Sequence, residues 1–180
     1  MKLFFISDIH GSVYYLEKAL ERYEEEKADY IIILGDILYH GARNPLPKGY
    51  NPKGVIELLN KLSKKIIAVR GNCDSEVDQM VLDFPLSGTY SNLLLGEQRL
   101  FLTHGHIYNK DKMVELEEGS VFVYGHTHIP ELKKIENIIY FNPGSMTLPK
   151  EDNPRTYGVM DESNIEIKTL DGEVFKKLCL

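Results

Sequence analysis

The chain has 180 residues, of which 43% are hydrophobic, and a formal net charge of -6. This length can bury one core, so we expect a single domain over residues 1–180. The acidic balance argues against nonspecific nucleic acid binding, which needs a basic face. No apolar run reaches the length of a membrane span, and the apolar start is too short for a signal peptide. With only two cysteines, we expect a cytoplasmic protein without a disulfide framework or membrane association.

The first part of the chain alternates apolar runs with amphipathic segments. Residues 3–6 are a continuous apolar run and residues 30–34 another, both typical of strands buried on both faces, and residues 65–69 predict a third strand. Ser12 can cap one helix, and Asn51 with the proline after it can begin another. This order predicts parallel strands joined by right-handed crossovers, whose carboxyl ends share one edge of a sheet. Active sites of open α/β sheets lie outside that edge.

The second part of the chain consists mainly of short strands. Residues 90–95 and 99–103 predict a hairpin around Gly96 and Glu97, and residues 111–118 predict a short surface helix. Further short strands are expected over residues 120–124, 138–141, 156–160 and 165–168. We interpret these strands as a second sheet packed on the first. The expected fold is α/β (α+β), a four-layer α/β/β/α sandwich of two packed mixed β-sheets flanked by helices.

Polar clusters rich in histidine and carboxylate side chains follow five of the expected strands. They are Asp8-Ile9-His10, Gly35-Asp36, Gly71-Asn72-Cys73-Asp74, His104-Gly105-His106 and Gly125-His126-Thr127-His128. Histidine is the commonest metal ligand and the usual proton carrier near neutral pH. About seven ligands at one edge are too many for one tetrahedral zinc ion, and they fit two ions that share a bridging carboxylate. The glycines before three of the ligands allow the backbone to turn sharply and approach the ions.

The ordered motifs Asp-x-His, Gly-Asp, Gly-Asn-x-Asp, His and Gly-His-x-His, from residue 8 to residue 128, resemble those of the calcineurin-like metallophosphoesterases. Residues 38–47 also resemble the small YfcE-type phosphodiesterases. The resemblance implies two divalent metal ions with Asp36 as the bridge between them. It implies that one ion is held by Asp8, His10, Asp36 and His128, and the other by Asp36, Asn72, His104 and His126.

The same resemblance implies a metal-dependent phosphodiesterase that hydrolyses small phosphodiesters, such as cyclic or linear nucleotides. Two ions can bind the phosphate oxygens and lower the pKa of a bridging water, so that hydroxide attacks phosphorus. The mixed ligands suit Mn²⁺, Fe²⁺, Co²⁺, Ni²⁺ or Zn²⁺, and the family resemblance points to Mn²⁺. The implied catalytic residues are Asp36, Asn72, Cys73, His104 and His106. Whether the chain forms a homo-oligomer is open.

Cys73 departs from the family pattern. Many members have histidine after the Gly-Asn pair, often read as the acid that protonates the leaving group. A thiol near cations tends toward thiolate and is then a poorer proton donor. We therefore expect a preference for diesters with acidic leaving groups, and His106 is the alternative proton donor.

The remaining candidate residues each have a second interpretation. His40 and His106 could orient a metal ligand, contact a substrate phosphate or lie at the surface. Arg43 and Asn44 could bind a substrate phosphate or belong to a solvated loop, and Asp74 is expected to orient a ligand or cap a helix. Two other functions also stay open: a calcineurin-like phosphomonoesterase, and a non-catalytic interaction scaffold like the relatives of the retromer scaffold subunit. The intact ligand set favours catalysis.

Overall fold

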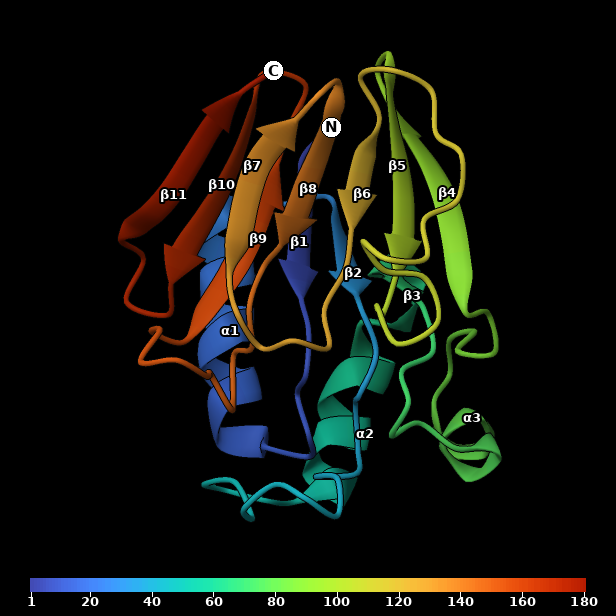
Figure 1. The fold of residues 1–180 in the computed structure, drawn as a ribbon. Coiled ribbons are helices and arrows are strands. Elements are labelled where there is room, and N and C mark those ends of the chain that lie inside the picture. Colours follow the sequence, from blue (N-terminus) through green and yellow to red (C-terminus); the bar gives the residue numbers. More distant parts are fainter.

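A computed structural model describes all 180 residues, which form two mixed β-sheets and three α-helices (Figure 1). The strands are β1 (Leu3–Ile6), β2 (Tyr30–Ile33), β3 (Ile66–Ala68), β4 (Tyr90–Leu95), β5 (Gln98–Thr103), β6 (Val121–Val123), β7 (Glu131–Ile135), β8 (Ile138–Asn142), β9 (Thr156–Met160), β10 (Asn164–Thr169) and β11 (Val174–Cys179). The first sheet has the order β11-β10-β9-β1-β2-β3, and the second has the order β4-β5-β6-β8-β7.

The helices are α1 (Val13–Glu26), α2 (Pro52–Lys61) and α3 (Glu76–Val81), and a 3₁₀ turn spans Ser63–Lys65. The two helix starts expected from the sequence are confirmed. The Ser12 hydroxyl accepts a hydrogen bond from the Tyr15 N–H at the start of α1, and the Asn51 side chain accepts one from the Gly54 N–H at the start of α2. Each such cap stabilises its helix by about 1 kcal/mol. None of the helices is long and apolar enough to cross a membrane.

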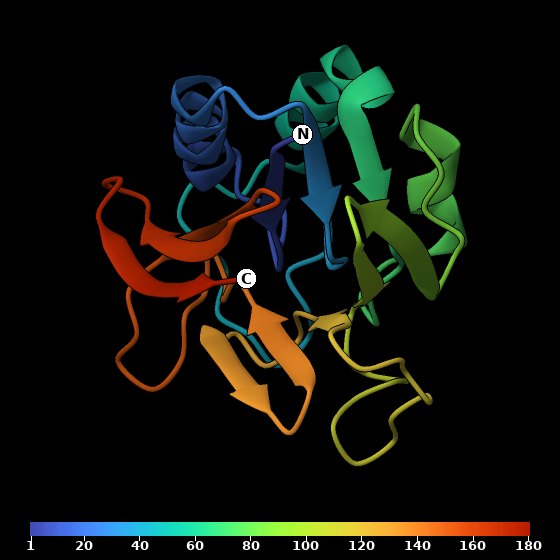
Figure 2. The same ribbon diagram turned by 90° about the horizontal axis from the view of Figure 1, so that it is seen from above.

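The first sheet is buried on both faces because its central strands are apolar at every position. Phe4 and Ile6 of β1 face α1 and α2, whereas Leu3 and Phe5 face the second sheet and pack with residues such as Leu102. Seen from above, α1 lies on one side of β1 and β2, and the β7–β8 hairpin lies on the other (Figure 2). The expected helix-on-sheet and sheet-on-sheet layers are therefore confirmed.

The distribution of strands between the sheets differs from the expectation that the second part of the chain builds the second sheet. β9, β10 and β11 extend the first sheet instead, because β9 pairs antiparallel with β1 along Leu3–Phe5. Both β9 faces are buried, as in the parallel strands beside it. β7 and β11 were not expected from the sequence, since both are rich in exposed lysine and lack a long apolar run.

The expected surface helix over residues 111–118 is wrong, because that segment has no helical structure. The Asn109 side-chain oxygen accepts hydrogen bonds from the Asp111 and Lys112 N–H groups, which competes with a helix start. The segment still covers the outer face of the second sheet, where Met113 and Val114 pack against a cluster containing Phe122.

Parallel pairing brings the site together at one edge. β1, β2 and β3 are parallel, and so are β5, β6 and β8 in the second sheet. β1, β2, β5 and β6 run in the same direction, downward in Figure 1, so the loops that follow them meet below the two sheets.

Candidate metal centre

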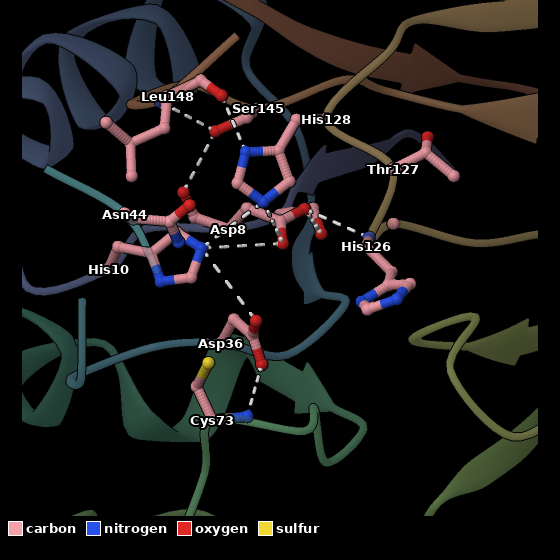
Figure 3. A network of polar contacts seen from close by, with 12 residues as sticks. Asp8, His10, Asp36, Asn44, Cys73, His126, Thr127, His128, Ser145 and Leu148 are labelled. Carbon is pink, nitrogen blue, oxygen red and sulfur yellow. Dashed lines mark hydrogen bonds and ion pairs between the residues drawn. The ribbon is translucent and has the colours of Figure 1, made fainter. Parts of the chain in front are cut away.

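The polar clusters expected to hold metal lie in the loops directly after five strands. Asp8 and His10 follow β1, and Asp36 follows β2. The hydrogen bonding of the sheet continues beyond the strands, since the Asp8 N–H donates to the Gly35 carbonyl at 3.2 Å and the His10 N–H to the Asp36 carbonyl at 2.9 Å. In the second sheet the Gly125 N–H donates to the His104 carbonyl at 2.9 Å. The side chains from these loops point toward one another (Figure 3).

The backbone is unusual at these positions. Nine non-glycine residues of the chain have positive φ, and five of them are expected ligands: Asp8, His10, Asp36, His126 and His128, with φ between 49° and 65°. This left-handed region is rarely occupied by residues with a Cβ, and each case costs about 1–3 kcal/mol. The strain is concentrated where the side chains must turn inward.

Three histidines are held in one tautomer by backbone carbonyls. A carbonyl can only accept, so the ring Nδ1 that contacts it carries the proton and leaves the Nε2 lone pair free. His10 Nδ1 lies 2.8 Å from Tyr39 O, His128 Nδ1 lies 2.6 Å from Leu148 O, and His104 Nδ1 lies 2.6 Å from Leu34 O. This is the arrangement by which proteins orient histidine as a metal ligand.

A first group of ligand atoms surrounds the Asp8 carboxylate. His10 Nε2 lies 3.4 Å from His128 Nε2, and Asp8 Oδ1 lies 3.2 Å from His128 Nε2. Asp8 Oδ2 accepts hydrogen bonds from the Ser7 hydroxyl and the His126 N–H, but Oδ1 is buried and has no hydrogen-bond partner. With both rings neutral, the two lone pairs and the carboxylate oxygen repel one another unless a proton on His128 or a metal cation lies among them. The donor set therefore fits a divalent metal ion.

A second group of ligand atoms surrounds His104. Its Nε2 lies 3.0 Å from Asn72 Oδ1, 3.2 Å from His126 Nδ1 and 3.4 Å from Asp36 Oδ1. These atoms are nitrogen and oxygen donors of the kind that bind first-row divalent metals.

Asp36 lies between the two groups. Its Oδ1 faces His104, whereas its Oδ2 lies 3.8 Å from His10 Nε2. The Cys73 N–H donates to Oδ1 at 2.8 Å and fixes the orientation of the carboxylate. The two oxygens of one carboxylate are thus directed into different groups of ligand atoms.

Asp74 holds the loop that carries Asp36. Its carboxylate accepts hydrogen bonds from three buried N–H groups, those of Asp36 at 2.9 Å, Ile37 at 2.8 Å and Gly71 at 2.7 Å. Asp74 therefore fixes the loop of the candidate ligand Asp36, and α3 is capped by Ser75.

Asp74→Asn should lower both stability and metal affinity. An amide NH₂ in place of one oxygen would face an N–H donor, so at least one buried hydrogen bond is lost, at a cost of about 1–3 kcal/mol of unfolding free energy. The displaced Asp36 should lower metal affinity by about 10- to 100-fold. Urea unfolding in EDTA and calorimetric titration with Mn²⁺ measure the two effects. Asp171→Asn, at an exposed turn, should change neither, and an Asp74→Asn protein with normal Mn²⁺ affinity would contradict this role.

The charges of the site shift several pKa values in the protein without metal. Burial acts to lower the pKa of His104, but its contact with the Asp36 carboxylate and the charges of Asp8 and Asp36 outweigh burial and raise the pKa to about 9. Burial acts to raise the pKa of Asp8, and the contact with His128 lowers it below its usual value. Burial and the nearby His104 charge lower the pKa of His106. A proton on His104 Nε2 thus compensates the carboxylates that a metal ion would neutralise.

The stability of the metal-free protein should depend on pH through His104. Its pKa rises from 6.5 to about 9 on folding, so its contribution is fully present below pH 6.5 and is lost as the pH rises through about 9. Metal binding must displace this proton, so Mn²⁺ affinity should increase over the same range. Urea unfolding in EDTA between pH 6.5 and 9 should show the decline in wild type and not in His104→Gln. If the free energy of unfolding declines equally in wild type and His104→Gln, titrating residues other than His104 cause the pH dependence.

A cavity of about 530 Å³ opens beside the candidate ligands. Arg43, Asn44 and Cys73 line it, together with the ligands Asp36, Asn72, His126 and His128. Asn44 is partly engaged within its own loop, because its side-chain NH₂ donates to the His40 carbonyl at 2.8 Å.

His40 and His106 do not line this cavity. The His40 ring packs edge-on against Tyr39 and Tyr50, with centroid distances of 4.8 and 5.4 Å. The His106 ring lies 5.3 Å from the ring of His104. Nδ1 of both histidines is buried without a hydrogen-bond partner. His106 thus lies beside the candidate ligand His104, whereas His40 packs among tyrosines, and contact of either residue with substrate stays a prediction.

The expected thiolate character of Cys73 refers to a thiol beside metal cations and stays a prediction, whereas the protein without metal has the opposite tendency. Burial, together with the Asp36 carboxylate, raises the pKa of the thiol to about 12. The charges of the chain that raise the pKa are those of the carboxylates Asp36, Asp74 and Asp8.

Polar residues that the sequence argument missed support the loops of the site. Asn142 donates to the Gly125 carbonyl at 3.0 Å, and the Ser145 hydroxyl donates to the Asp8 carbonyl at 3.1 Å. Lys150 lines the cavity. The signal that could have identified this segment is the cluster Asn142-Pro143-Gly144-Ser145, which follows an apolar run as the five other clusters do.

Comparisons with known proteins match nearly the whole chain. Residues 1–164 match a family model described as the calcineurin-like phosphoesterase superfamily domain. Phosphodiesterase YfcE of Escherichia coli strain K12 is 49% identical over 173 residues, which are 96% of this chain and 94% of the relative. Phosphodiesterase MJ0936 of Methanocaldococcus jannaschii is 24% identical over 178 residues, which are 94% of this chain and 98% of the relative.

Solved structures show the same fold. The structure of YfcE, described as a phosphoesterase from E. coli, has a TM-score of 0.97 at 47% identity, and the match covers 99% of this chain and 98% of that chain. Vacuolar protein sorting 29 from Cryptosporidium parvum has a TM-score of 0.65 at 17% identity, with 99% and 96% of the two chains covered. At 17% identity, the similarity to vacuolar protein sorting 29 shows a shared fold alone.

Proposed function

The chain belongs to the calcineurin-like phosphoesterase superfamily, and from that membership we propose that it is a phosphodiesterase that uses two divalent metal ions, most readily Mn²⁺. The observation that carries the proposal is the position of Asp36. Its two carboxylate oxygens face two separate groups of nitrogen and oxygen atoms, as a carboxylate shared between two ions requires. The diester specificity rests on the similarity to phosphodiesterase YfcE.

We assign Asp8, His10, Asp36 and His128 to one ion, and Asp36, Asn72, His104 and His126 to the other. In support, the ligand atoms of Asp8, His10 and His128 lie within 4.8 Å of one another. For the second set, His104 Nε2 lies 3.0 Å from Asn72 Oδ1, 3.2 Å from His126 Nδ1 and 3.4 Å from Asp36 Oδ1. When bound, two divalent ions act as Lewis acids that bind phosphate oxygens, neutralise charge in the transition state and lower the pKa of water between them. The mixed nitrogen and oxygen set also suits Fe²⁺, Co²⁺, Ni²⁺ or Zn²⁺.

The residues of the chain orient this centre and receive the substrate. Three carbonyls, two from the loop after β2 and one from the loop after β8, hold three histidine rings with Nε2 directed inward, and the Cys73 N–H holds the Asp36 carboxylate. A cavity of about 530 Å³ next to the ligands is of the size that takes a small molecule. A small phosphodiester fits this space better than a phosphoprotein segment, which needs a longer groove.

The candidate ligands come from both sheets, since β1 and β2 precede some of them and β5 and β6 precede others. We therefore propose that residues 1–180 act as one domain, because neither sheet alone carries a complete ligand set. A cytoplasmic location and the choice between monomer and homo-oligomer stay predictions.

Cys73→His should change the preference among leaving groups. The thiol lines the cavity beside Asp36, at the position where many members of the family have histidine. An imidazole there can donate a proton to a poor leaving group, so we expect the variant to hydrolyse p-nitrophenyl phosphate faster, relative to bis-p-nitrophenyl phosphate, than wild type does. Steady-state rates on both esters measure this ratio, and Cys73→Ser serves as the control of similar size. An unchanged ratio would exclude a simple role for this position.

The proposed function is tested by removing metal and adding single metals back. The stripped protein is assayed with Mn²⁺, Ni²⁺, Co²⁺ or Zn²⁺ on bis-p-nitrophenyl phosphate and on the monoester. We expect hydrolysis of the diester with at least one metal and a lower rate on the monoester. No activity with any metal would refute the proposed enzymatic function. Faster hydrolysis of the monoester than of the diester would show that the protein is a phosphomonoesterase instead.

A further inference from the structure

We propose that Arg43 and Lys150 form an anion subsite beside the metal centre, so that preferred substrates carry a second phosphate group in addition to the phosphodiester. The inference rests on the proposed function, because it takes the phosphodiester to be bound at the metal ligands. It assigns a role to Lys150, which no sequence motif indicated, and it gives Arg43 a specific target.

The two side chains line the same cavity from different loops. Arg43 lies in the loop after β2 and Lys150 in the loop after β8, and both line the cavity that also contains Asp36 and His128. No other lysine or arginine lines this space. Both residues are exposed, and neither takes part in an ion pair. The cavity therefore contains two cationic side chains that form no ion pair within the protein, and the carboxylates of Asp36 and Asp74 line the same space.

The backbone at both positions is fixed by local hydrogen bonds. Asn44 closes the turn that carries Arg43, because its N–H donates to the Gly41 carbonyl at 3.1 Å. The Lys150 N–H donates to the carbonyl of the candidate ligand His128 at 3.3 Å, and the Lys150 carbonyl accepts from the Asn153 N–H at 3.2 Å. The subsite is thus connected through the backbone to the loop that holds His128.

The acidic residues next to Lys150 do not neutralise it. Glu151 and Asp152 follow it in the sequence, but both adopt left-handed backbone with φ of 55°, and neither pairs with the lysine. Both carboxylates are exposed. The positive charge is therefore local to the cavity in a chain whose formal net charge is -6.

The number of cations exceeds what one phosphodiester requires. A diester carries a single negative charge, which two divalent ions at the proposed ligands already compensate. Arg43 offers a planar fork of donors that matches phosphate oxygens, and Lys150 adds a compact charge. The formal net charge of -6 disfavours a polyanion, so a small substrate with two phosphate groups fits the chain better than a nucleic acid.

The test compares two p-nitrophenyl diesters that differ by one phosphate. The substrates are thymidine 5′-(p-nitrophenyl phosphate) and the same compound with a 3′-phosphate, both assayed with the Mn²⁺-loaded enzyme. We expect kcat/KM to be about tenfold or more higher for the phosphorylated compound, since hydrogen bonds to charged groups contribute about that factor. Lys150→Gln and Arg43→Gln should each reduce this ratio severalfold. Lys61→Gln, in the last turn of α2, should leave the ratio unchanged.

A binding measurement separates failure of this inference from failure of the proposed function. Calorimetry of thymidine 3′,5′-bisphosphate and thymidine 5′-phosphate should show tighter binding of the bisphosphate to wild type than to Lys150→Gln, whether or not the enzyme turns over. If wild type hydrolyses both diesters with equal kcat/KM, the subsite is wrong and the proposed phosphodiesterase activity is unaffected. The same conclusion follows if Lys150→Gln and Arg43→Gln both keep the wild-type ratio of kcat/KM between the two diesters. Hydrolysis of neither diester with any metal would overturn the proposed function, and equal affinity for the two nucleotides would overturn the subsite as well.

Discussion

Asp36→Asn should reduce metal-dependent hydrolysis of bis-p-nitrophenyl phosphate by more than about 100-fold. Loss of a residue that only orients a metal ligand lowers activity by about 10- to 100-fold, and loss of the ligand itself should have a larger effect. The carboxylate directs Oδ1 toward His104 and Oδ2 toward His10. Asparagine keeps the size of the side chain and one carbonyl oxygen, but it loses the negative charge and the second acceptor. One of the two ions should then be lost, which metal analysis after gel filtration would detect.

The isosteric exchange separates a loss of ligand from a loss of fold. The Cys73 N–H can still donate to the asparagine oxygen, so the loop should keep its position. Asp171→Asn makes the same chemical change at an exposed turn between β10 and β11 and should keep the wild-type rate. An Asp36→Asn protein that binds two ions and hydrolyses the diester at more than a third of the wild-type rate would exclude the bridging role.

Gly71→Ala should displace the Asp36 carboxylate from its position, because the added methyl group would occupy the same space. A Cβ on Gly71 would lie 2.1 Å from Asp36 Oδ1 and 2.5 Å from the Asp36 nitrogen, distances that no real contact reaches. Asp36 must therefore shift, and we expect a loss of about 1–3 kcal/mol in unfolding free energy from overpacking. Affinity for Mn²⁺ should decrease by about 10- to 100-fold, as when an orienting group is removed. Denaturation in EDTA and calorimetric titration measure the two effects separately.

Gly88→Ala is the matched control for this substitution. Gly88 also lies outside the left-handed region, and its added Cβ would meet only the Tyr90 carbonyl at 3.3 Å. The change in backbone entropy is the same at both positions, so the difference between the two variants reports the contact with Asp36. If the two proteins match in stability and in Mn²⁺ affinity, the close approach of Gly71 has no part in holding the carboxylate.

The positions of the candidate ligands could be predicted because each step depends on local sequence. Short apolar runs indicate buried strands, right-handed crossovers make successive strands parallel, and parallel strands end at one edge. Asp8 and Asp36 could therefore be expected to meet, although 28 positions separate them in the sequence. The contact between His10 and His128 follows from the same rule applied to the second sheet.

The division of strands between the sheets could not be predicted, because it depends on pairing between distant segments. The sequence of β9 is compatible with either sheet, and its pairing with β1 is decided by packing over a separation of more than 150 residues. β7 and β11 could not be recognised, since exposed lysines interrupt their apolar pattern. The segment 111–118 could not be recognised as irregular, because its conformation depends on packing of Met113 and Val114 against aromatic residues of the second sheet.

The details of the site also exceed what a pattern of residue types can show. The left-handed backbone at His126 and the three N–H groups that surround Asp74 arise from loops that meet only in the folded chain. The raised pKa of Cys73 depends on its distance from Asp36, which the sequence does not contain. Residue types predicted a metal centre, and the tertiary structure determines how its ligands are oriented.

The central claim is a centre that needs two metal ions for diester hydrolysis, and the dependence of rate on bound metal tests it most directly. Metal-free protein is titrated with Mn²⁺, and the ions bound per chain are measured beside the rate on bis-p-nitrophenyl phosphate. We predict that the rate stays low until the first site is filled and reaches its maximum at two ions per chain. A full rate with one ion, or two bound ions without hydrolysis of the diester, would contradict the account.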